Sequence, residues 1–213
     1  PAVEAPAPEL SAPSLQPPPD AHPLDAEDAL WLYDSGGDTT TELLSRELDV
    51  DTELQADMLA VVNSIPEFRR ALASDRLGLF LVDLNDPLNL RVATVRPDWE
   101  TFTASLSKIA VLLATVQKAR DDDDPDLLVR RKEELDLMIK RSKNPATMAI
   151  FGEVGFEAMR DSVYRYHLYD DELGGLWWTP NHNNRTAKTR GSITATPRMA
   201  TRYFLMMEQG RLL

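Results

Sequence analysis

Apolar residues recur at helical spacing soon after residue 50. Leu54, Met58 and Val62 are four residues apart and follow Asp51, which predicts a helix capped by that aspartate. Pro66 is suited to start a second, shorter helix. The apolar runs L-G-L-F-L-V-D-L and R-V-A-T-V-R, separated by N-D-P-L-N, then predict two strands joined by a turn. The folded part of the chain is therefore expected to begin with two helices and an antiparallel hairpin.

The spacing becomes helical again after the hairpin. One helix is predicted over 105–120, and the sequence D-D-D-D-P breaks it, with the last aspartate as cap and the proline as first residue of a helix reaching 141. Each helix has about 15 residues and a length of roughly 22 Å. An antiparallel return would therefore bring Ser142 back to the level of Ser105.

Two more helices are predicted towards the C-terminus, with a long connection between them. Asn144 and Pro145 read as the cap and first residue of a helix, and G-F-E-A-M-R-D-S-V-Y-R-Y-H continues with an amphipathic pattern. Residues 168–195 read as an irregular connection, a length at which loops are usually functional. The pair Thr-Pro at 196–197 starts the last helix, which Gly210 is expected to end.

The chain divides into three parts by composition. Eight of its 15 prolines lie in residues 1–23, which contain no aromatic residue and are predicted to be a disordered linker. Residues 24–49 read as an acidic, irregular lead-in, and residues 50–213 as the folded domain. A Pro-rich arm is typical of exported proteins, so we expect a periplasmic or extracellular protein with an N-terminal tether; a linker between domains is the alternative.

Charge and composition exclude several classes of function. The 213 residues carry 23 Lys and Arg against 35 Asp and Glu, a net charge of -12, without the dense basic cluster that nucleic acid requires. No apolar run is long enough to span a bilayer, and the absence of cysteine excludes disulfides and thiol catalysis. His22, His167 and His182 lack metal-ligand spacing, and the acidic run 121–124 lacks the pattern of a calcium loop. No metal or other cofactor is expected.

The stretch S-L-S-K at 105–108 holds the clearest candidate chemistry. In a helix Ser105 and Lys108 share a face, and the apolar residues after the lysine would desolvate its amine and lower its pKa towards that of a general base. The first turn of a helix also favours a developing oxyanion. The simpler alternative is a lysine that snorkels from a buried helix and a serine that caps it.

This stretch, read as T-F-T-A-S-L-S-K-I-A, resembles the S-x-x-K nucleophile motif of the serine β-lactamase and penicillin-binding protein superfamily. S-K-N at 142–144 resembles the superfamily's S-x-N motif, with Lys143 where class A enzymes have Asp. The segments I-P-E-F-R-R-A-L-A, G-G-L-W-W and T-A-T-P-R-M-A extend the similarity over residues 50–213. The resemblance implies an α+β fold, with a helical subdomain and an antiparallel sheet.

It also implies roles for four residues. Ser105 would be the acylated nucleophile, Lys108 its base, Ser142 a proton shuttle to the leaving group, and Asn144 a hydrogen-bond partner of the substrate amide. The implied reaction is acyl transfer from an amide or ester, such as a peptidoglycan-like peptide or a β-lactam. The alternatives are a catalytically inactive envelope module that binds a peptide, glycan or protein, and an inactive fragment.

Two family motifs have no counterpart. The K-[ST]-G motif should follow the last helix, whereas Lys188-Thr189-Arg190 precedes it and has Arg in place of Gly. The chain is therefore expected to be either a piece of a longer protein or a degenerate member with an incomplete sheet. E-x-x-L-N is also missing, and Glu172, the nearest acid, reads as a solvated loop residue.

One further segment, Trp177-Trp178 with the asparagines of N-H-N-N after it, could form a rim for a glycan or peptide. Packing of one tryptophan in the core is the commoner arrangement for this residue type.

Overall fold

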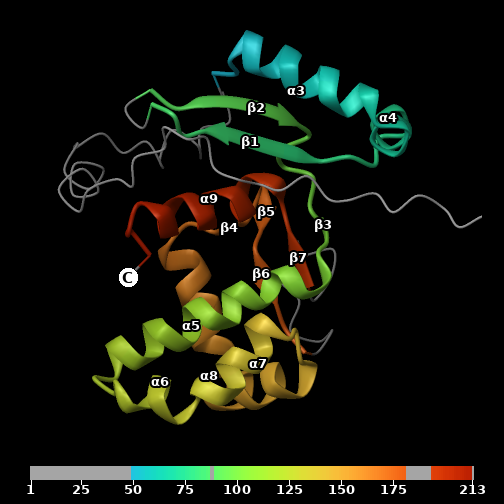
Figure 1. The fold of residues 1–213 in the computed structure, drawn as a ribbon. Helices are drawn as coiled ribbons and strands as arrows, with labels where there is room; N and C mark the ends of the chain where they lie inside the picture. The colour runs from blue at the N-terminus through green and yellow to red at the C-terminus, as the bar shows by residue number, and fades with distance from the viewer. Residues whose placement is uncertain (1–48, 87–88, 181–192, 213) are drawn as a thin grey trace, which may run out of the picture. The chain divides into compact units, whose positions relative to one another are not determined.

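The computed structural model describes residues 49–86, 89–180 and 193–212, all of which belong to the unit Ser35–Leu213. The predicted linker 1–23, and all but the last residue of the segment 24–49, lie outside these residues. Helices and short antiparallel strands occur in separate blocks along the described chain, which confirms the predicted α+β class (Figure 1). The elements, in chain order, are α3 (Thr52–Ser64), α4 (Pro66–Ala73), β1 (Leu79–Asp83), β2 (Arg91–Val95), β3 (Thr101–Phe102), η1 (Ala104–Ser107), α5 (Lys108–Asp121), α6 (Asp126–Arg130), α7 (Lys132–Lys140), α8 (Asn144–Arg165), β4 (Tyr169–Asp170), β5 (Gly174–Gly175), β6 (Trp177–Trp178), β7 (Ile193–Ala195) and α9 (Pro197–Glu208).

The predicted helix pair and hairpin are confirmed. Asp51 caps α3, because its carboxylate accepts a hydrogen bond from the backbone N–H of Leu54 at 2.8 Å. Pro66 occupies the start of α4, where its missing N–H is not needed. Strands β1 and β2 are antiparallel, with Leu79 opposite Val95 at one end of the register.

Helix α3 covers one face of the β1–β2 hairpin and α9 covers the other (Figure 1). The Gln55 side chain joins α3 to β2, because its amide both donates to the carbonyl of Thr94 and accepts from its N–H, at 2.9 and 2.8 Å. On the opposite face, Leu205 of α9 and Val92 of β2 are buried together. Contacts on both faces place the hairpin as the middle layer between helices α3 and α9.

Helix α5 is the centre of the helical part and packs along α8. Its residues Ala110, Val111 and Ala114 are completely buried, as are Ile150 and Val163 of α8. Apolar residues surround α5 on most sides, as expected for a helix enclosed by other elements. This packing fixes the first residue of α5, which carries the candidate lysine.

The prediction of one helix up to residue 141 is wrong, because the chain breaks at Arg131 into α6 and α7. The prediction of Pro125 as the first helical residue is also shifted, since Pro125 is the N-cap and α6 begins at Asp126. The backbone of Arg131 leaves helical geometry, with φ −101° and ψ 8°. The break turns the guanidinium groups of Arg130 and Arg131 towards α8.

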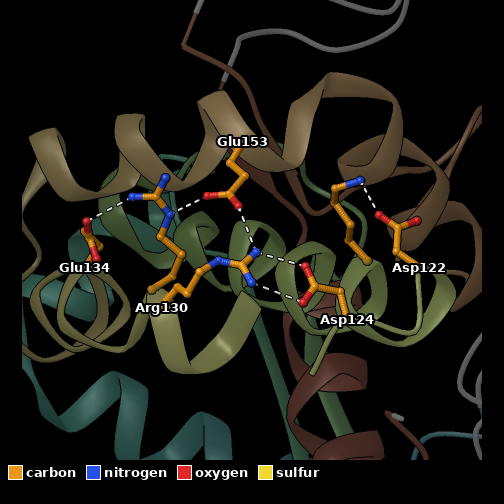
Figure 2. Close-up of polar contacts among 7 residues, drawn as sticks. Asp122, Asp124, Arg130, Glu134 and Glu153 are labelled. Atoms are coloured by element: carbon orange, nitrogen blue, oxygen red, sulfur yellow. Dashed lines mark hydrogen bonds and ion pairs between the residues drawn. The ribbon is translucent and has the colours of Figure 1, made fainter. Parts of the chain in front are cut away.

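Both arginines pair with Glu153 of α8, and Figure 2 labels Arg130 and Glu153 at this contact. Arg131 bonds to Glu153 and to Glu134, the latter at 3.1 Å, while Arg130 lies 3.6 Å from Glu153 and 2.9 Å from Asp124. These side chains are partly exposed, so each pair adds little stability by itself. Together they join the α6–α7 break to α8, and the acidic run 121–124 contributes Asp124 as an ion-pair partner of Arg130.

The prediction of an irregular connection over 168–195 is wrong for its described part. Strands β4 and β5 form a small hairpin, and β7 pairs with both β3 and β6 in the order β3-β7-β6. Trp177 is fully buried and Trp178 is 5% exposed, with Trp178 edge-on to Phe151 at 5.0 Å. The favoured prediction that a tryptophan packs in the core is therefore confirmed, and the alternative of a glycan or peptide rim is wrong for these two residues. Neighbouring strand residues point to opposite faces, so both faces of β6 must be covered.

The asparagines of N-H-N-N, with His182 between them, and the segment Lys188-Thr189-Arg190 lie outside the described residues, as does His22.

The last helix agrees with its prediction. Thr196 caps α9 by accepting from the N–H of Met199 at 3.2 Å, and Gly210 follows the helix with a φ of 62° that suits glycine. Helix α8 also contains the predicted amphipathic segment, but a break at Gly155 (φ 84°) separates it from the first half of the same helix.

Candidate active site

Ser105 lies in η1, the single 3-10 turn that connects β3 to α5, and it is exposed. The α-helix begins at Lys108, so the prediction of an α-helix from residue 105 is wrong for its first three residues. Ala104 has a left-handed φ of 49°, and the backbone N–H of Lys108 bonds to the carbonyl of Ser105. In a 3-10 turn residues three apart eclipse each other, so Ser105 and Lys108 remain on one side of the turn.

Lys108 is 3% exposed, and its ammonium donates two hydrogen bonds to Ser142. The distance from Nζ is 2.7 Å to the carbonyl oxygen and 3.2 Å to the hydroxyl oxygen. Burial lowers the pKa of Lys108 below the ordinary value of 10.5, because desolvation penalises the charged form. Among the residues that the structure describes, no carboxylate forms an ion pair with this lysine. The lysine is not a snorkelling residue, since its charged end is held inside by another segment.

Ser142 lies in the turn between α7 and α8 and has a left-handed φ of 53°. The backbone N–H groups of Arg141 and Lys143 both bond back to the carbonyl of Leu137, at 3.2 and 3.0 Å, which closes the end of α7. The chain therefore reverses at Ser142 and presents two of its oxygen atoms to Lys108. Ser142 therefore returns to the first motif, as predicted, and the residue of that motif that it contacts is Lys108.

Asn144 is the first residue of α8 and is exposed. The prediction that it caps this helix is wrong, because Lys143 is the N-cap and makes no capping bond with its side chain. No hydrogen bond joins the Asn144 side chain to another described residue, and the same holds for the Ser105 hydroxyl. The structure thus brings Lys108 and Ser142 into direct contact, whereas Ser105 and Asn144 are exposed, three residues before Lys108 and two residues after Ser142.

A groove of about 280 Å³ lies next to the serine turn. Leu79 and Phe80 of β1, Leu106 of η1 and Pro197 of α9 give it apolar walls. Thr103 also lines it, but the Thr103 hydroxyl is buried and has no hydrogen-bond partner in the described structure. Thr103 and Leu106 flank Ser105 in the sequence. The groove offers a position for an apolar group next to the serine.

Other candidates lie apart from this site. Glu172 is exposed in the turn of the β4–β5 hairpin, where its N–H bonds to Asp170, and His167 is exposed after α8. Within residues 49–86, 89–180 and 193–212, no group of His, Cys, Asp and Glu side chains could hold a metal ion.

The sequence analysis gave no role to the cations around Ser142. Arg141 and Lys143 flank it directly, both are exposed, and neither forms an ion pair within the described part of the chain. The letters K-R-S-K-N already contain this signal, but only the structure shows that a nearby acid of α7, Asp136, pairs with Lys140, at 2.9 Å.

Comparison with known proteins gives no family: no family model, no curated protein and no solved structure matches the chain. None of the described helices combines the length and apolarity needed to cross a bilayer. The residues of the site and their geometry are therefore what supports a functional assignment.

Proposed function

We propose that this chain is an active-site-serine hydrolase that transfers acyl groups from an amide or ester to Ser105. The observation that carries the proposal is the buried Lys108, which follows the exposed Ser105 by three residues. Its Nζ lies 2.7 Å from the carbonyl oxygen of Ser142 and 3.2 Å from the hydroxyl oxygen. A buried amine with a lowered pKa and no carboxylate partner is suited to accept a proton. The similarity of S-L-S-K and S-K-N to the motifs of serine β-lactamases and penicillin-binding proteins supports the same assignment, and a fold of that type belongs to the proposal.

The reaction follows from these positions. The Oγ of Ser105 attacks the substrate carbonyl carbon, and this attack forms a tetrahedral oxyanion. The hydroxyl proton passes at the same time to Lys108 in its deprotonated, neutral form. Lys108 then returns a proton through the hydroxyl of Ser142, to which it is hydrogen-bonded, and the leaving amine or alcohol departs with that proton as the carbon–heteroatom bond breaks. Water, or another hydroxyl or amine, attacks the resulting ester of Ser105 and releases the acyl group.

Two neighbouring features fit this reaction. The groove beside η1 would receive an apolar part of the substrate, and the exposed amide of Asn144 would bind the substrate amide. The substrate class is a peptidoglycan-like peptide or a β-lactam. The Pro-rich arm adds a periplasmic or extracellular location to the proposal.

Covalent labelling tests the function. The folded protein is exposed to a fluorescent penicillin and, separately, to a fluorescent fluorophosphonate, and the label is read on a denaturing gel. Wild type should be labelled and Ser105→Ala should not, while Ser74→Ala, which removes another exposed serine hydroxyl, should be labelled like wild type. Equal labelling of wild type and Ser105→Ala would reject Ser105 as the nucleophile.

The second candidate is a catalytically inactive module of the same type that binds a peptide, glycan or protein. It is favoured by one observation, that the ammonium of Lys108 bonds to Ser142 while no hydrogen bond joins it to the hydroxyl of Ser105 in the described structure. A folded wild-type protein that neither probe labels would support this candidate.

A further inference from the structure

We infer that the outer face of α7 is the interface of a symmetric dimer with a second copy of this chain. This α7 face consists of Glu133, Leu137 and Arg141, which are exposed and four residues apart, so they lie in one row along the helix. Arg141 follows the last residue of α7, but its N–H still bonds to the carbonyl of Leu137 at 3.2 Å, so it continues the helical spacing. The inference does not depend on the proposed function, because none of these residues acts on the substrate.

A groove of about 630 Å³ contains the α7 face and extends to α6. Two apolar side chains line it, Val129 with 73% of its surface exposed and Leu137 with 36%. The other side of α7 packs against α8, where Met138 is buried (Figure 1). Within the described part of the chain, no element covers the apolar residues of the groove, so a partner would gain stability by burying them.

Two charges of the groove have no partner in the same chain. Glu133 and Arg141 form no ion pair with another described residue, although both line the groove. The remaining charges pair internally: Arg130 with Asp124, and Lys132 and Lys140 with Asp136. The groove therefore needs one acid and one base from its occupant.

A second copy supplies both charges in the correct places. At a rise of 1.5 Å per residue, Glu133 lies about 6 Å before Leu137 along the helix, and Arg141 about 6 Å after it. A two-fold axis through Leu137 therefore sets each Glu133 opposite the Arg141 of the other copy. One contact made twice satisfies four charges around an apolar centre of two leucines, as an isologous interface requires.

The register of this pairing follows from charge. An axis at Glu133 would bring Val129 opposite Leu137, but it would also oppose the two copies of Glu133, and like charges disfavour such a contact. The axis at Leu137 avoids this and also sets Glu134 opposite Lys140, a further pair of opposite sign. Because the contact is centred on one helix, we expect a small, weak interface of less than about 1,200 Å².

Charge reversal tests the pairing by sedimentation velocity at several protein concentrations. At physiological ionic strength, general repulsion between two chains of net charge -12 is screened beyond about 8 Å. Wild type should dimerise reversibly, and Glu133→Arg or Arg141→Glu should each weaken the dimer by about tenfold or more, because attraction becomes repulsion at both contacts. The double variant Glu133→Arg/Arg141→Glu exchanges the two charges and should restore the wild-type dissociation constant within a few-fold.

The matched control is Asp57→Arg, which changes the net charge as Glu133→Arg does at an exposed acid of α3 without an ion pair among the described residues. It should not weaken the dimer. Both single reversals lower the net negative charge in one case and raise it in the other, so a general charge effect would move their dissociation constants in opposite directions.

The substitution Leu137→Cys tests the position of the axis. The chain has no cysteine, so the variant carries a single thiol. A disulfide requires Cα atoms roughly 4.4 to 6.8 Å apart, so it forms readily between copies only if residue 137 lies near the axis. With dioxygen and a copper catalyst as oxidant, two thiols lose two protons and two electrons and form one S–S bond. Leu137→Cys should crosslink much faster than Val61→Cys, which places a thiol at an exposed position of α3.

Wild type that stays monomeric at every concentration would overturn the inference and leave the groove to a partner of another kind. A dimer that the double variant does not restore, or that crosslinks equally through Val61→Cys, would overturn the assignment to the α7 face. Labelling of Ser105 is measured separately, so none of these results decides the proposed function.

Discussion

Replacing Lys108 with methionine separates the structural cost of a buried ammonium from its chemical role. Methionine has a similar length and retains the apolar contacts of the lysine stem, but it cannot take or give a proton. If Lys108 is the general base, acylation of Ser105 should slow by about 10²- to 10⁴-fold. If Lys108 is only a structural residue, the same substitution should instead lower stability.

The structure sets the expected stability. The variant loses two hydrogen bonds to Ser142, worth about 1.5 to 3 kcal/mol each because the donor is charged. It also removes the penalty of several kcal/mol for burying an ammonium that is only 3% exposed and has no described carboxylate partner. The two terms are of similar size, so we expect the free energy of unfolding at pH 7 to lie within about 1 kcal/mol of wild type, or above it.

The pH dependence gives a second check. Burial lowers the pKa of Lys108 in the folded state below the ordinary value of 10.5. At pH values between the folded-state pKa and 10.5, the unfolded chain therefore holds a proton that the folded chain has lost. The stability of wild type relative to Lys108→Met should therefore rise as the pH increases through that interval towards 10.5. Urea titrations at several pH values measure this difference, and the rate of labelling by a fluorophosphonate measures the activity.

A loss of stability above about 3 kcal/mol at pH 7, with labelling reduced only in proportion to the folded fraction, would refute this reasoning. Lys108 would then be a structural partner of Ser142, as in the inactive module.

Three further predictions concern the surroundings of the site. Ser142→Gly and Ser142→Ala should both slow release of the leaving group. Ser142→Gly should be about 0.5 to 1 kcal/mol more stable than Ser142→Ala in urea titrations, because residue 142 has a left-handed φ of 53° that glycine adopts more easily. Equal stability of the two variants would argue against this backbone geometry. Gly175→Ala should destabilise by about 3 kcal/mol or more in the same assay, because the added Cβ would lie 2.3 Å from the carbonyl oxygen of Leu168; a neutral effect would contradict the β4–β5 hairpin. Arg91 holds the pKa of Asp51 at about 2, so wild type should lose more stability than Asp51→Asn as the pH falls from about 4 to about 2; parallel acid titrations of the two would contradict the pairing.

Those parts of the fold that depend on local signals could be predicted from the sequence. Asp51 before an apolar repeat, Pro66 and Pro197 at helix starts, and two apolar runs around a turn each correspond to an element of the structure. These signals act over a few residues, so they need no knowledge of distant contacts.

The wrong predictions depend on contacts between distant segments. The break at Arg131 accompanies its bond to Glu153, 22 residues later, which no local pattern reveals. Strands β6 and β7 each have only two or three residues, too few to show an alternating pattern. Burial of both Trp177 and Trp178 likewise follows from elements on both faces of a strand that was not predicted.

The candidate site was predictable in part for the same reason. Two helical stretches of equal length imply that Ser142 returns to the first motif, and the structure places it against Lys108. The 3-10 turn under Ser105 was missed, because four residues of either helix type share one local pattern. The sequence also could not show that Arg141 and Lys143 form no ion pair among the described residues, since this depends on which acids the other cations bind.

The central claim, that Lys108 activates Ser105, is tested most directly by the pH dependence of acylation at Ser105 itself. Fluorophosphonate reactions are stopped at intervals from pH 6 to 11, and peptide mass spectrometry quantifies the adduct on the peptide that contains Ser105. The account predicts a rate that rises through a single ionisation below 10.5 in wild type and is at least about 100-fold slower, without that ionisation, in Lys108→Met. Identical pH profiles in the two proteins, or an adduct on another serine, would contradict it.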